Sequence, residues 1–295
     1  MVEAKPMNPA NPHFGAEVTG IDVANMTEEA RDAFIDAMDR FAVCVIRGIT
    51  MTDDQHVAFS RWFGEPEPRP NYGHAGVVNR LQHRELFDIS NLNHNGELLG
   101  ENDRRRMFRL ANQMWHTDSS YRQGGASYSM LASYIVPSEG ADTEFADLRA
   151  AYDALPPQRK AQLEGLVAEH SIEYSRSLIG YAFDDQERSQ RPPALQYLLQ
   201  TNRRTGRKAL YLASYASHVV GMDPSEGRAL LKDLTERATR EEFLFRHKWR
   251  VGDLLVWDNR CTMHRATPFE GTTEKRDLRR TTLYGDLPDP ALCAG

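Results

Sequence analysis

Apolar residues recur at helical spacing in the first part of the chain. Between positions 27 and 41, Phe34, Met38 and Phe41 follow one another at intervals of four and three residues, as on one face of a helix. Two glutamates directly after Thr27 suit the positive end of a helix dipole. The pattern therefore predicts a helix that begins after Thr27 and continues to about Phe41.

A strand and a second helix are predicted next. The run Ala42–Ile46 is continuously apolar and stops before Gly48, which is typical of a buried strand. Thr52, with Gln55 three residues later, has the pattern of a capping box, and Gly64 is a suitable helix end. The predicted order of elements is therefore helix, strand, helix.

The remaining chain changes from helical to strand-like patterns. Residues 147–155 and 157–170 have helical patterns, and Asp223, followed by a proline, marks another helix start. The C-terminal third instead contains short β-branched or aromatic runs between turn residues. These predicted strands are Glu242–Trp249, Leu254–Asp258, Thr262–Ala266 and Arg280–Gly285. We therefore predict a mixed α+β fold with a mainly β core.

Composition excludes several classes of function. The chain has 36 Lys and Arg against 42 Asp and Glu, a net charge of -6, whereas a protein that coats nucleic acid needs a basic footprint. Its longest apolar run, Phe41–Ile46, is too short for a signal peptide or a membrane span. The three cysteines are scattered and lack CxxC spacing. We expect a cytoplasmic protein without a nucleic-acid or membrane partner.

The sequence contains no internal repeat and no low-complexity linker. Residues 1–295 are therefore predicted to form a single domain, in which residues 1–14 and 287–295 are frayed ends.

Two of the ten histidines have a carboxylate two residues later: His116, before Asp118, and His83, before Glu85. Residues i and i+2 of a strand project from the same face, so either pair could direct an imidazole and a carboxylate at one metal ion. A third, distant histidine would complete the 2-His-1-carboxylate triad of non-haem iron enzymes. The spacing alone is a weak pattern, and a surface role is the alternative for each pair.

Longer motifs favour the first pair. They are Trp115–Tyr121, Gly140–Thr143, Trp257–His264 and Arg276–Thr281. In this order they resemble the motifs of the iron(II)- and 2-oxoglutarate-dependent taurine dioxygenase family, and the resemblance extends from about Gly15 to Asp286. It implies a double-stranded β-helix, or jelly-roll, core with flanking helices. It also implies Fe(II), 2-oxoglutarate and O2 as cofactor and cosubstrates.

The resemblance assigns roles to individual residues. The implied iron ligands, which would also be the catalytic residues, are His116, Asp118 and His264; the implied 2-oxoglutarate contacts are Thr143 and Arg276; and Arg280 is implied to bind the substrate's anionic group. A guanidinium fork matches a carboxylate bidentately, which agrees with both arginine roles. If their segment is a strand, the two arginines share a face. An ordinary basic surface patch is the alternative.

Further residues match positions that line the substrate pocket in this family. Asn112 and Tyr121 lie four residues before and five residues after the first implied ligand, and Tyr72 and His74 lie in the segment 65–81. Tyr121 could stack on an aryl ring or close the core. His74 could contact substrate or lie in solvent.

Three hypotheses follow for function. The first is hydroxylation of an anionic small molecule, with an aryloxyalkanoate-like carboxylate as substrate. The second is the same chemistry on a sulfonate, a sulfate ester or a secondary-metabolite intermediate. The third is a non-catalytic jelly-roll binding protein, which the intact triad, Thr143 and Arg276 disfavour. A homo-oligomer is compatible with each.

Overall fold

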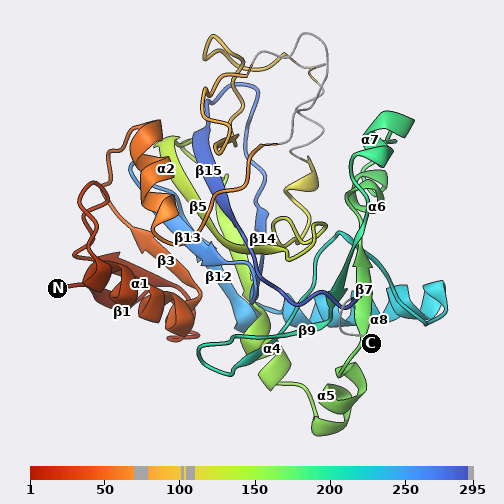
Figure 1. The fold of residues 1–295 in the computed structure, drawn as a ribbon. Coiled ribbons are helices and arrows are strands. Elements are labelled where there is room, and N and C mark those ends of the chain that lie inside the picture. The colour runs from red at the N-terminus through yellow and green to blue at the C-terminus, as the bar shows by residue number, and fades with distance from the viewer. Residues whose placement is uncertain (70–78, 101–102, 104–109, 292–295) are drawn as a thin grey trace.

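The computed structural model describes residues 1–69, 79–100, 103 and 110–291, and its largest element is a seven-stranded sheet (Figure 1). In spatial order its strands are β1 (Glu3–Pro6), β2 (Ala16–Thr19), β3 (Val43–Ile46), β13 (Leu254–Asp258), β5 (Ala126–Ile135), β15 (Asp277–Tyr284) and β4 (Phe87–Asp88). Neighbouring strands are antiparallel, apart from β2 and β3, which are parallel. The sheet thus places the middle of the chain beside its C-terminal strands.

Alternation along the strands gives this sheet two faces. In β3, Val43 and Val45 pack into one hydrophobic core, whereas Cys44 and Ile46 pack into another. Successive side chains of a strand point to opposite sides, so each core lies against one face. We call the face that carries Val43 and Val45 the inner face and the opposite one the outer face.

Two helices cover the outer face: α1 (Glu28–Phe41) and α2 (Asp53–Arg61) (Figure 1). The Thr27 hydroxyl accepts a hydrogen bond from the Ala30 N–H at 3.2 Å and so caps α1. Thr52 and Gln55 form the reciprocal bonds of a capping box, at 3.2 and 2.9 Å. Both predicted helix starts are confirmed, because local side-chain oxygens satisfy the first N–H groups.

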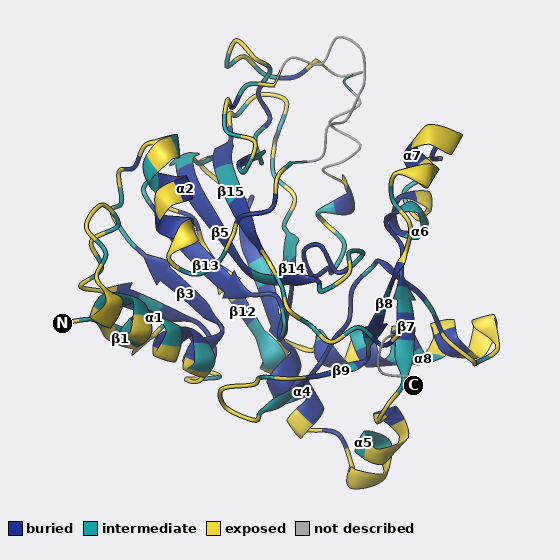
Figure 2. Cartoon of the chain, viewed as in Figure 1, coloured by how far each residue is buried: buried dark blue, intermediate teal, exposed yellow. Residues whose placement is uncertain are grey.

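A three-stranded sheet lies against the inner face. Its strands are β12 (Leu244–His247), β6 (Thr143–Asp147) and β14 (Thr262–Ala266), in that order. Phe145, Phe245 and Met263 from these strands join the inner core. Figure 2 shows β5, β13 and β15 as largely buried, in dark blue. The fold is therefore mixed α+β with β-sheets around its core, as the sequence predicted.

Smaller elements complete the fold. They are a sheet of β11 (Ala216–Val219), β7 (Val167–His170) and β8 (Ala194–Tyr197), a hairpin of β9 (Leu199–Thr201) and β10 (Lys208–Leu210), the helices α4 (Leu148–Asp153), α5 (Pro157–Leu163), α6 (Ile172–Ser177), α7 (Asp185–Ser189) and α8 (Pro224–Ala238), and a 3-10 turn at Glu241–Phe243. The helix start after Asp223 is confirmed, since its carboxylate caps α8. Likewise, α4 agrees with the helix predicted at 147–155.

The helix predicted over residues 157–170 is wrong in its second half. Helix α5 ends at Leu163, and Gly165 then adopts a left-handed φ of 71°, which a glycine accepts without strain. Residues 167–170 alternate between half-buried and buried positions and form strand β7. The period of burial changes from helical to strand-like at this glycine, within a single apolar pattern.

The ends of the chain also differ from expectation. Residues 3–6 are paired with residues 16–19 as β1 and β2, and Phe14 is fully buried, so the segment 1–14 is not frayed. The Leu287 N–H donates to the Gly124 carbonyl at 3.1 Å, and residues 292–295 lie outside the described part of the chain. In the described ranges, the helices are all too short or too polar to cross a membrane.

Candidate metal centre

The structure brings the three implied ligands together on the inner side of the large sheet. His116, Asp118 and His264 are buried, and their candidate ligand atoms lie within 4.8 Å of one another. The Nε2 atoms of His116 and His264 lie 3.9 and 3.8 Å from the Asp118 oxygens. Reciprocal backbone hydrogen bonds of 3.0 and 2.8 Å join the two histidines across a β-bridge. Residues far apart in sequence are thereby fixed as neighbours.

Each imidazole is oriented by its surroundings. The Nδ1 atom of His116 lies 2.8 Å from the Met114 carbonyl. A carbonyl only accepts, so Nδ1 carries the proton and Nε2 presents its lone pair to the centre. The ring of His264 packs against Trp257 at 4.7 Å and Phe145 at 5.8 Å, measured between centroids. Trp257 is thus a core residue that packs beside a candidate metal ligand.

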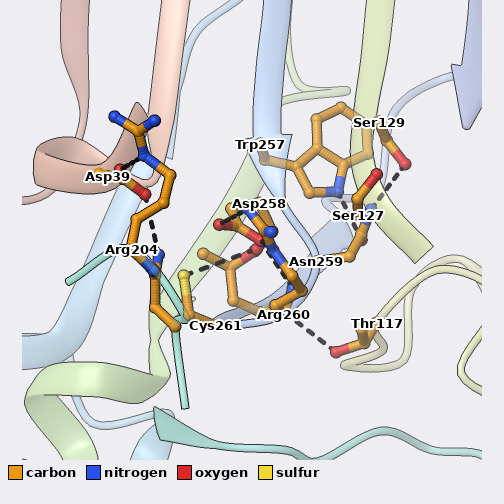
Figure 3. A network of polar contacts seen from close by, with 12 residues as sticks. Asp39, Thr117, Ser127, Ser129, Arg204, Trp257, Asp258, Asn259, Arg260 and Cys261 are labelled. Carbon is orange, nitrogen blue, oxygen red and sulfur yellow. Dashed lines mark hydrogen bonds and ion pairs between the residues drawn. The ribbon is translucent and has the colours of Figure 1, made fainter. Parts of the chain in front are cut away.

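A hydrogen-bond network holds Asp118, and Figure 3 shows the part of it formed by Ser129, Trp257 and Asn259. The Asp118 N–H donates to the Asn259 side-chain oxygen at 3.2 Å, and the Ser129 hydroxyl donates to Asp118 Oδ2 at 2.8 Å. Asn259 also donates to Ser129 at 2.9 Å and accepts from the Trp257 indole at 3.0 Å. The carboxylate therefore has a fixed position before any ligand arrives.

Asn259 and Ser129 were not singled out from the sequence as site residues. Asn259 lies inside the motif Trp257–His264, where only the final histidine was assigned a role. Strand β5 carries no comparable signal, because Ser129 becomes relevant only when β5 pairs with β13. Arg260 strengthens this turn by a bidentate contact of 2.8 Å with Asp258.

Burial and charge set the protonation of the triad. Burial lowers the pKa of His264 well below its ordinary value, and the neighbouring His116 lowers it further. Burial by itself would raise the pKa of Asp118, but the charge of Arg280 and a hydrogen bond from Ser129 lower it overall. The site thus presents a carboxylate and two neutral imidazoles, which is a donor set suited to a divalent iron.

Arg280 lies directly at the centre. Its Nη1 donates to Asp118 Oδ1 at 2.6 Å, and its guanidinium carbon lies over the Phe87 ring, 5.3 Å from the ring centroid. Thr282, two residues on, contacts Ser129 at 3.2 Å, so both side chains belong to the inner face of β15. The sequence-predicted proximity of Arg280 to the active centre is therefore seen in the structure.

Thr143 lies on the strand beside His264. In the register of β6 and β14, His264 faces Phe145 and Ala266 faces Thr143, so Thr143 is about 7 Å along the same face. Thr143 is buried, and its hydroxyl accepts from the Trp249 indole at 3.1 Å. The hydroxyl is thus held in place next to the metal-ligand strand.

Arg276 is buried directly before the first residue of β15. Its N–H donates to the Asn91 side chain at 2.7 Å, and its Nη1 donates to the Ile89 carbonyl at 2.8 Å. Asn91, which the sequence did not single out, thereby anchors this arginine. The strand register is irregular between Asp277 and Leu278, so simple alternation does not place Arg276 on the same face as Arg280.

Of the four predicted substrate-pocket residues, the structure describes Asn112 and Tyr121. The Asn112 carbonyl accepts from the Ala266 N–H at 2.8 Å, and half-buried Tyr121 packs edge-on against Tyr215 at 4.8 Å. Tyr72 and His74 lie outside the described residues.

The rival pair is not a metal site. His83 contacts Asp54 at 2.7 Å, whereas Glu85 contacts Arg61 at 3.0 Å, so the two side chains have separate partners near the surface.

Glu67 is a buried carboxylate close to the triad that the sequence did not reveal. It accepts from the Ser119 hydroxyl at 2.5 Å and from Arg122 at 2.7 Å. Ser119 has a left-handed φ of 51° immediately after Asp118, so this contact supports an uncommon backbone conformation. Burial raises the pKa of Glu67, against the lowering effect of Arg122.

Comparison with known proteins identifies the class. The sequence profile of the "Taurine catabolism dioxygenase TauD, TfdA family" matches residues 3–282. The chain belongs to this family. It is an oxidoreductase of the iron(II)- and 2-oxoglutarate-dependent type, which agrees with its His116, Asp118 and His264 triad and with the activities for which its relatives are named.

Several relatives match nearly the whole chain. The alpha-ketoglutarate-dependent 2,4-dichlorophenoxyacetate dioxygenase of Cupriavidus pinatubonensis is 42% identical over 285 residues, covering 95% of this chain and 97% of the relative. The (S)-phenoxypropionate/alpha-ketoglutarate-dioxygenase of Sphingobium herbicidovorans is 34% identical, covering 94% of each. A crystal structure of AAD-2 with Mn(II) and N-oxalylglycine has a TM-score of 0.88 and 39% identity, covering 98% of both chains.

Proposed function

We propose that this protein hydroxylates an anionic small molecule, an aryloxyalkanoate-like carboxylate, on a single-domain jelly-roll core. The observation that carries the proposal is the buried triad of His116, Asp118 and His264 with Arg280 in contact with its carboxylate. The named activities of the two phenoxyalkanoate-type relatives support the choice of substrate class.

The triad would hold Fe(II) through two imidazole nitrogens and one carboxylate oxygen. When bound, the iron supplies the oxidising chemistry with O2 and 2-oxoglutarate, which is converted to succinate and CO2. Asn259 and Ser129 keep Asp118 oriented, and the carbonyl of Met114 keeps the Nε2 of His116 unprotonated. These groups hold the ligand set ready, so binding of the metal requires little rearrangement.

Thr143 and Arg276 would receive 2-oxoglutarate. A guanidinium can hold the carboxylate remote from the metal by two parallel hydrogen bonds, and a hydroxyl adds one donor. The anchoring of Arg276 by Ile89 and Asn91, and of Thr143 by Trp249, fixes both donors. The AAD-2 structure holds N-oxalylglycine, which is a dicarboxylate like 2-oxoglutarate, and this supports a dicarboxylate as the cosubstrate.

Arg280 would bind the substrate's carboxylate. Its Nη1 donates to the Asp118 carboxylate at 2.6 Å, so the guanidinium lies beside the metal centre. There it would also contact the carboxylate of a bound substrate. A guanidinium has several donors and can serve both anions. The ether-linked carbon next to the bound carboxylate would then be held close to the iron, while Tyr121 and Asn112 would border the rest of the molecule.

A screen of succinate formation tests the proposal. Protein with Fe(II) and 2-oxoglutarate is incubated with phenoxyacetate, phenoxypropionate, an alkyl sulfate and taurine, and succinate is measured together with phenol release. We expect the aryloxyalkanoates to stimulate succinate formation most, with phenol released in proportion. Stimulation by the sulfate or the sulfonate alone would favour the second hypothesis, and iron-independent binding without succinate would favour a binding protein.

A further inference from the structure

Helix α6, which carries the buried Arg176, lies close to the metal centre. Helix α6 is fastened to the segment beside it, since the Ser171 N–H donates to the Tyr215 carbonyl at 2.8 Å and Ser175 contacts Ser214 at 3.1 Å through their hydroxyls. The Ser214 N–H in turn donates to the Trp115 carbonyl at 2.9 Å, next to the first metal ligand. Helix α6 is therefore tied to the metal site through two short contacts.

An aromatic wall lies between α6 and the metal ligands. The Tyr215 ring is edge-on to His116 at 6.3 Å and edge-on to Tyr121 at 4.8 Å. Tyr215 is buried and packs with Ile172 and Phe183 in a small hydrophobic cluster, to which Tyr121 also belongs. This wall offers apolar ring faces and edges to a molecule bound above the iron.

Arg176, from α6, brings a positive charge to this wall. It is only 8% exposed, and its guanidinium donates a hydrogen bond to the Tyr215 hydroxyl. A buried cation from α6 thus lies beside the Tyr215 ring, which packs edge-on against His116.

We propose that Arg176 determines substrate specificity by binding a hydrogen-bond-accepting or anionic substituent on the part of the substrate remote from Arg280. Placing a guanidinium at nine-tenths burial beside an active centre is costly unless acceptors surround it, and the hydroxyl of Tyr215 supplies one. Through this hydrogen bond the guanidinium lies at the edge of the aromatic wall, where a substituent carried past the Tyr121 and Tyr215 rings would meet it. This inference rests on the proposed function, because it assumes an anionic substrate bound at Arg280.

The inference predicts a preference between two matched compounds. Phenoxyacetate and 4-carboxyphenoxyacetate differ only in a carboxylate on the ring. The wild-type protein should bind the second at least about tenfold more tightly, because a charge-assisted bidentate contact is added. A chlorinated ring, which is a poor acceptor, should gain no such advantage.

The experiment measures binding without turnover. The protein is loaded with Mn(II) and N-oxalylglycine, and the dissociation constant of each compound is determined by calorimetry for wild type, Arg176→Met, Arg176→Lys and Tyr215→Phe. Arg188→Met is the matched control, since Arg188 lies on neighbouring α7, is about half exposed and pairs with Glu173 on α6. Thermal unfolding of every variant identifies any that fails to fold.

In Arg176→Met, the preference for 4-carboxyphenoxyacetate should fall to about twofold or less, while phenoxyacetate binding changes by less than about threefold. Arg176→Lys should retain part of the preference, because it keeps the charge and loses the fork. Tyr215→Phe, which keeps the ring, should weaken the preference, and Arg188→Met should leave it unchanged.

Several results would overturn the inference. Equal weakening of both compounds in Arg176→Met would mean that Arg176 binds their common carboxylate or only supports the fold. An absent preference in wild type would refute it directly. Because binding is measured without turnover, a protein that prefers the dianion but hydroxylates neither compound would contradict the proposed function and leave the role of Arg176 supported.

Discussion

The two faces of strand β15 carry the same kinds of residue but differ in what those residues do. On the outer face, Arg279 contacts Asp53 at 2.5 Å and lies over the Tyr134 ring at 4.2 Å. On the inner face, Arg280 contacts Asp118 at 2.6 Å. Both faces therefore contain a partly buried arginine paired with an aspartate, yet only the inner pair belongs to a metal centre.

A buried histidine also occurs on each side. His56, from α2, is fully buried on the outer face, with Nε2 3.4 Å from the Thr281 hydroxyl. His264, on the inner face, is buried beside two further ligand groups. Burial, perturbed protonation and charge pairing are thus shared by both faces. What distinguishes the site is that several lone pairs converge within 4.8 Å.

Removing a ligand from the inner face should have the largest effect. We expect His264→Ala to lower Fe(II) affinity by more than about 100-fold and to abolish coupled turnover, because the metal loses one of three protein ligands. Equilibrium dialysis with Fe(II) and succinate assays measure both quantities. Circular dichroism should still show a folded protein, since the inner core is large. Turnover near the wild-type rate in this variant would refute the triad.

Exchanging the two arginines for alanine compares the faces directly. Arg280→Ala should raise the substrate KM with the 2-oxoglutarate KM nearly kept, and should form more succinate per product because the substrate is loosely held. Arg279→Ala should keep both KM values and instead lower the free energy of unfolding by about 1–3 kcal/mol, through loss of its ion pairs. If both variants altered the two KM values alike, the distinction between the faces would fail.

Arg276→Ala should act on the cosubstrate alone. Loss of a buried charge-assisted pair costs about 2–5 kcal/mol, so the 2-oxoglutarate KM should rise at least about 30-fold. Lys275→Ala is the matched control, because Lys275 is exposed and contacts only a backbone carbonyl, that of Gly96, in the described structure. A larger effect on the substrate KM than on the 2-oxoglutarate KM would exchange the proposed roles of the two arginines.

The sequence predicted the parts of this site that short motifs encode. The triad and Arg280 lie in motifs that resemble those of the dioxygenase family, and the structure places them together. The strand expected for the first motif is limited to a β-bridge at His116, and Asp118 lies in a turn. Capping residues such as Thr27 and Thr52 act within a few positions, so the helix starts were also predictable. These features depend on local chemistry, which is visible in a single sequence.

Features that depend on strand pairing were not predictable in this way. Ser129 reaches Asp118 only because β5 lies between β13 and β15, and β5 has no motif of its own. Glu67 comes from a proline-rich segment that reads as a loop, but it is buried against Ser119. Strand β7 was missed because Gly165 divides one apolar pattern between a helix and a strand.

The buried outer-face histidine, His56, should make the stability of the protein depend on pH. Burial lowers the pKa of His56 to about 4, whereas an unfolded histidine has a pKa of about 6.5. Below about pH 6.5 the unfolded chain binds a proton that the folded protein cannot, so stability is lost as the pH falls towards 4, by up to about 1.4 kcal/mol per pH unit. His56→Gln should therefore lose less stability than wild type between pH 7 and pH 5.

Denaturant unfolding at several pH values measures this difference, and His13→Gln, at an exposed position, is the control. An unchanged pH dependence in His56→Gln would mean that the buried neutral imidazole does not contribute to acid sensitivity.

The smallest effect is expected for His83, the histidine of the rival pair. Its Nε2 contacts Asp54, whose side chain is 84% exposed, and ion pairs of that kind contribute about 0–1 kcal/mol. His83→Ala should therefore change the free energy of unfolding by no more than about 1 kcal/mol and leave Fe(II) affinity at the wild-type value. Both are measured as for His264→Ala. Because His83 and His116 have the same local spacing to a carboxylate, loss of iron binding in His83→Ala would show that the pattern, and not the convergence of buried ligands, marks the metal site.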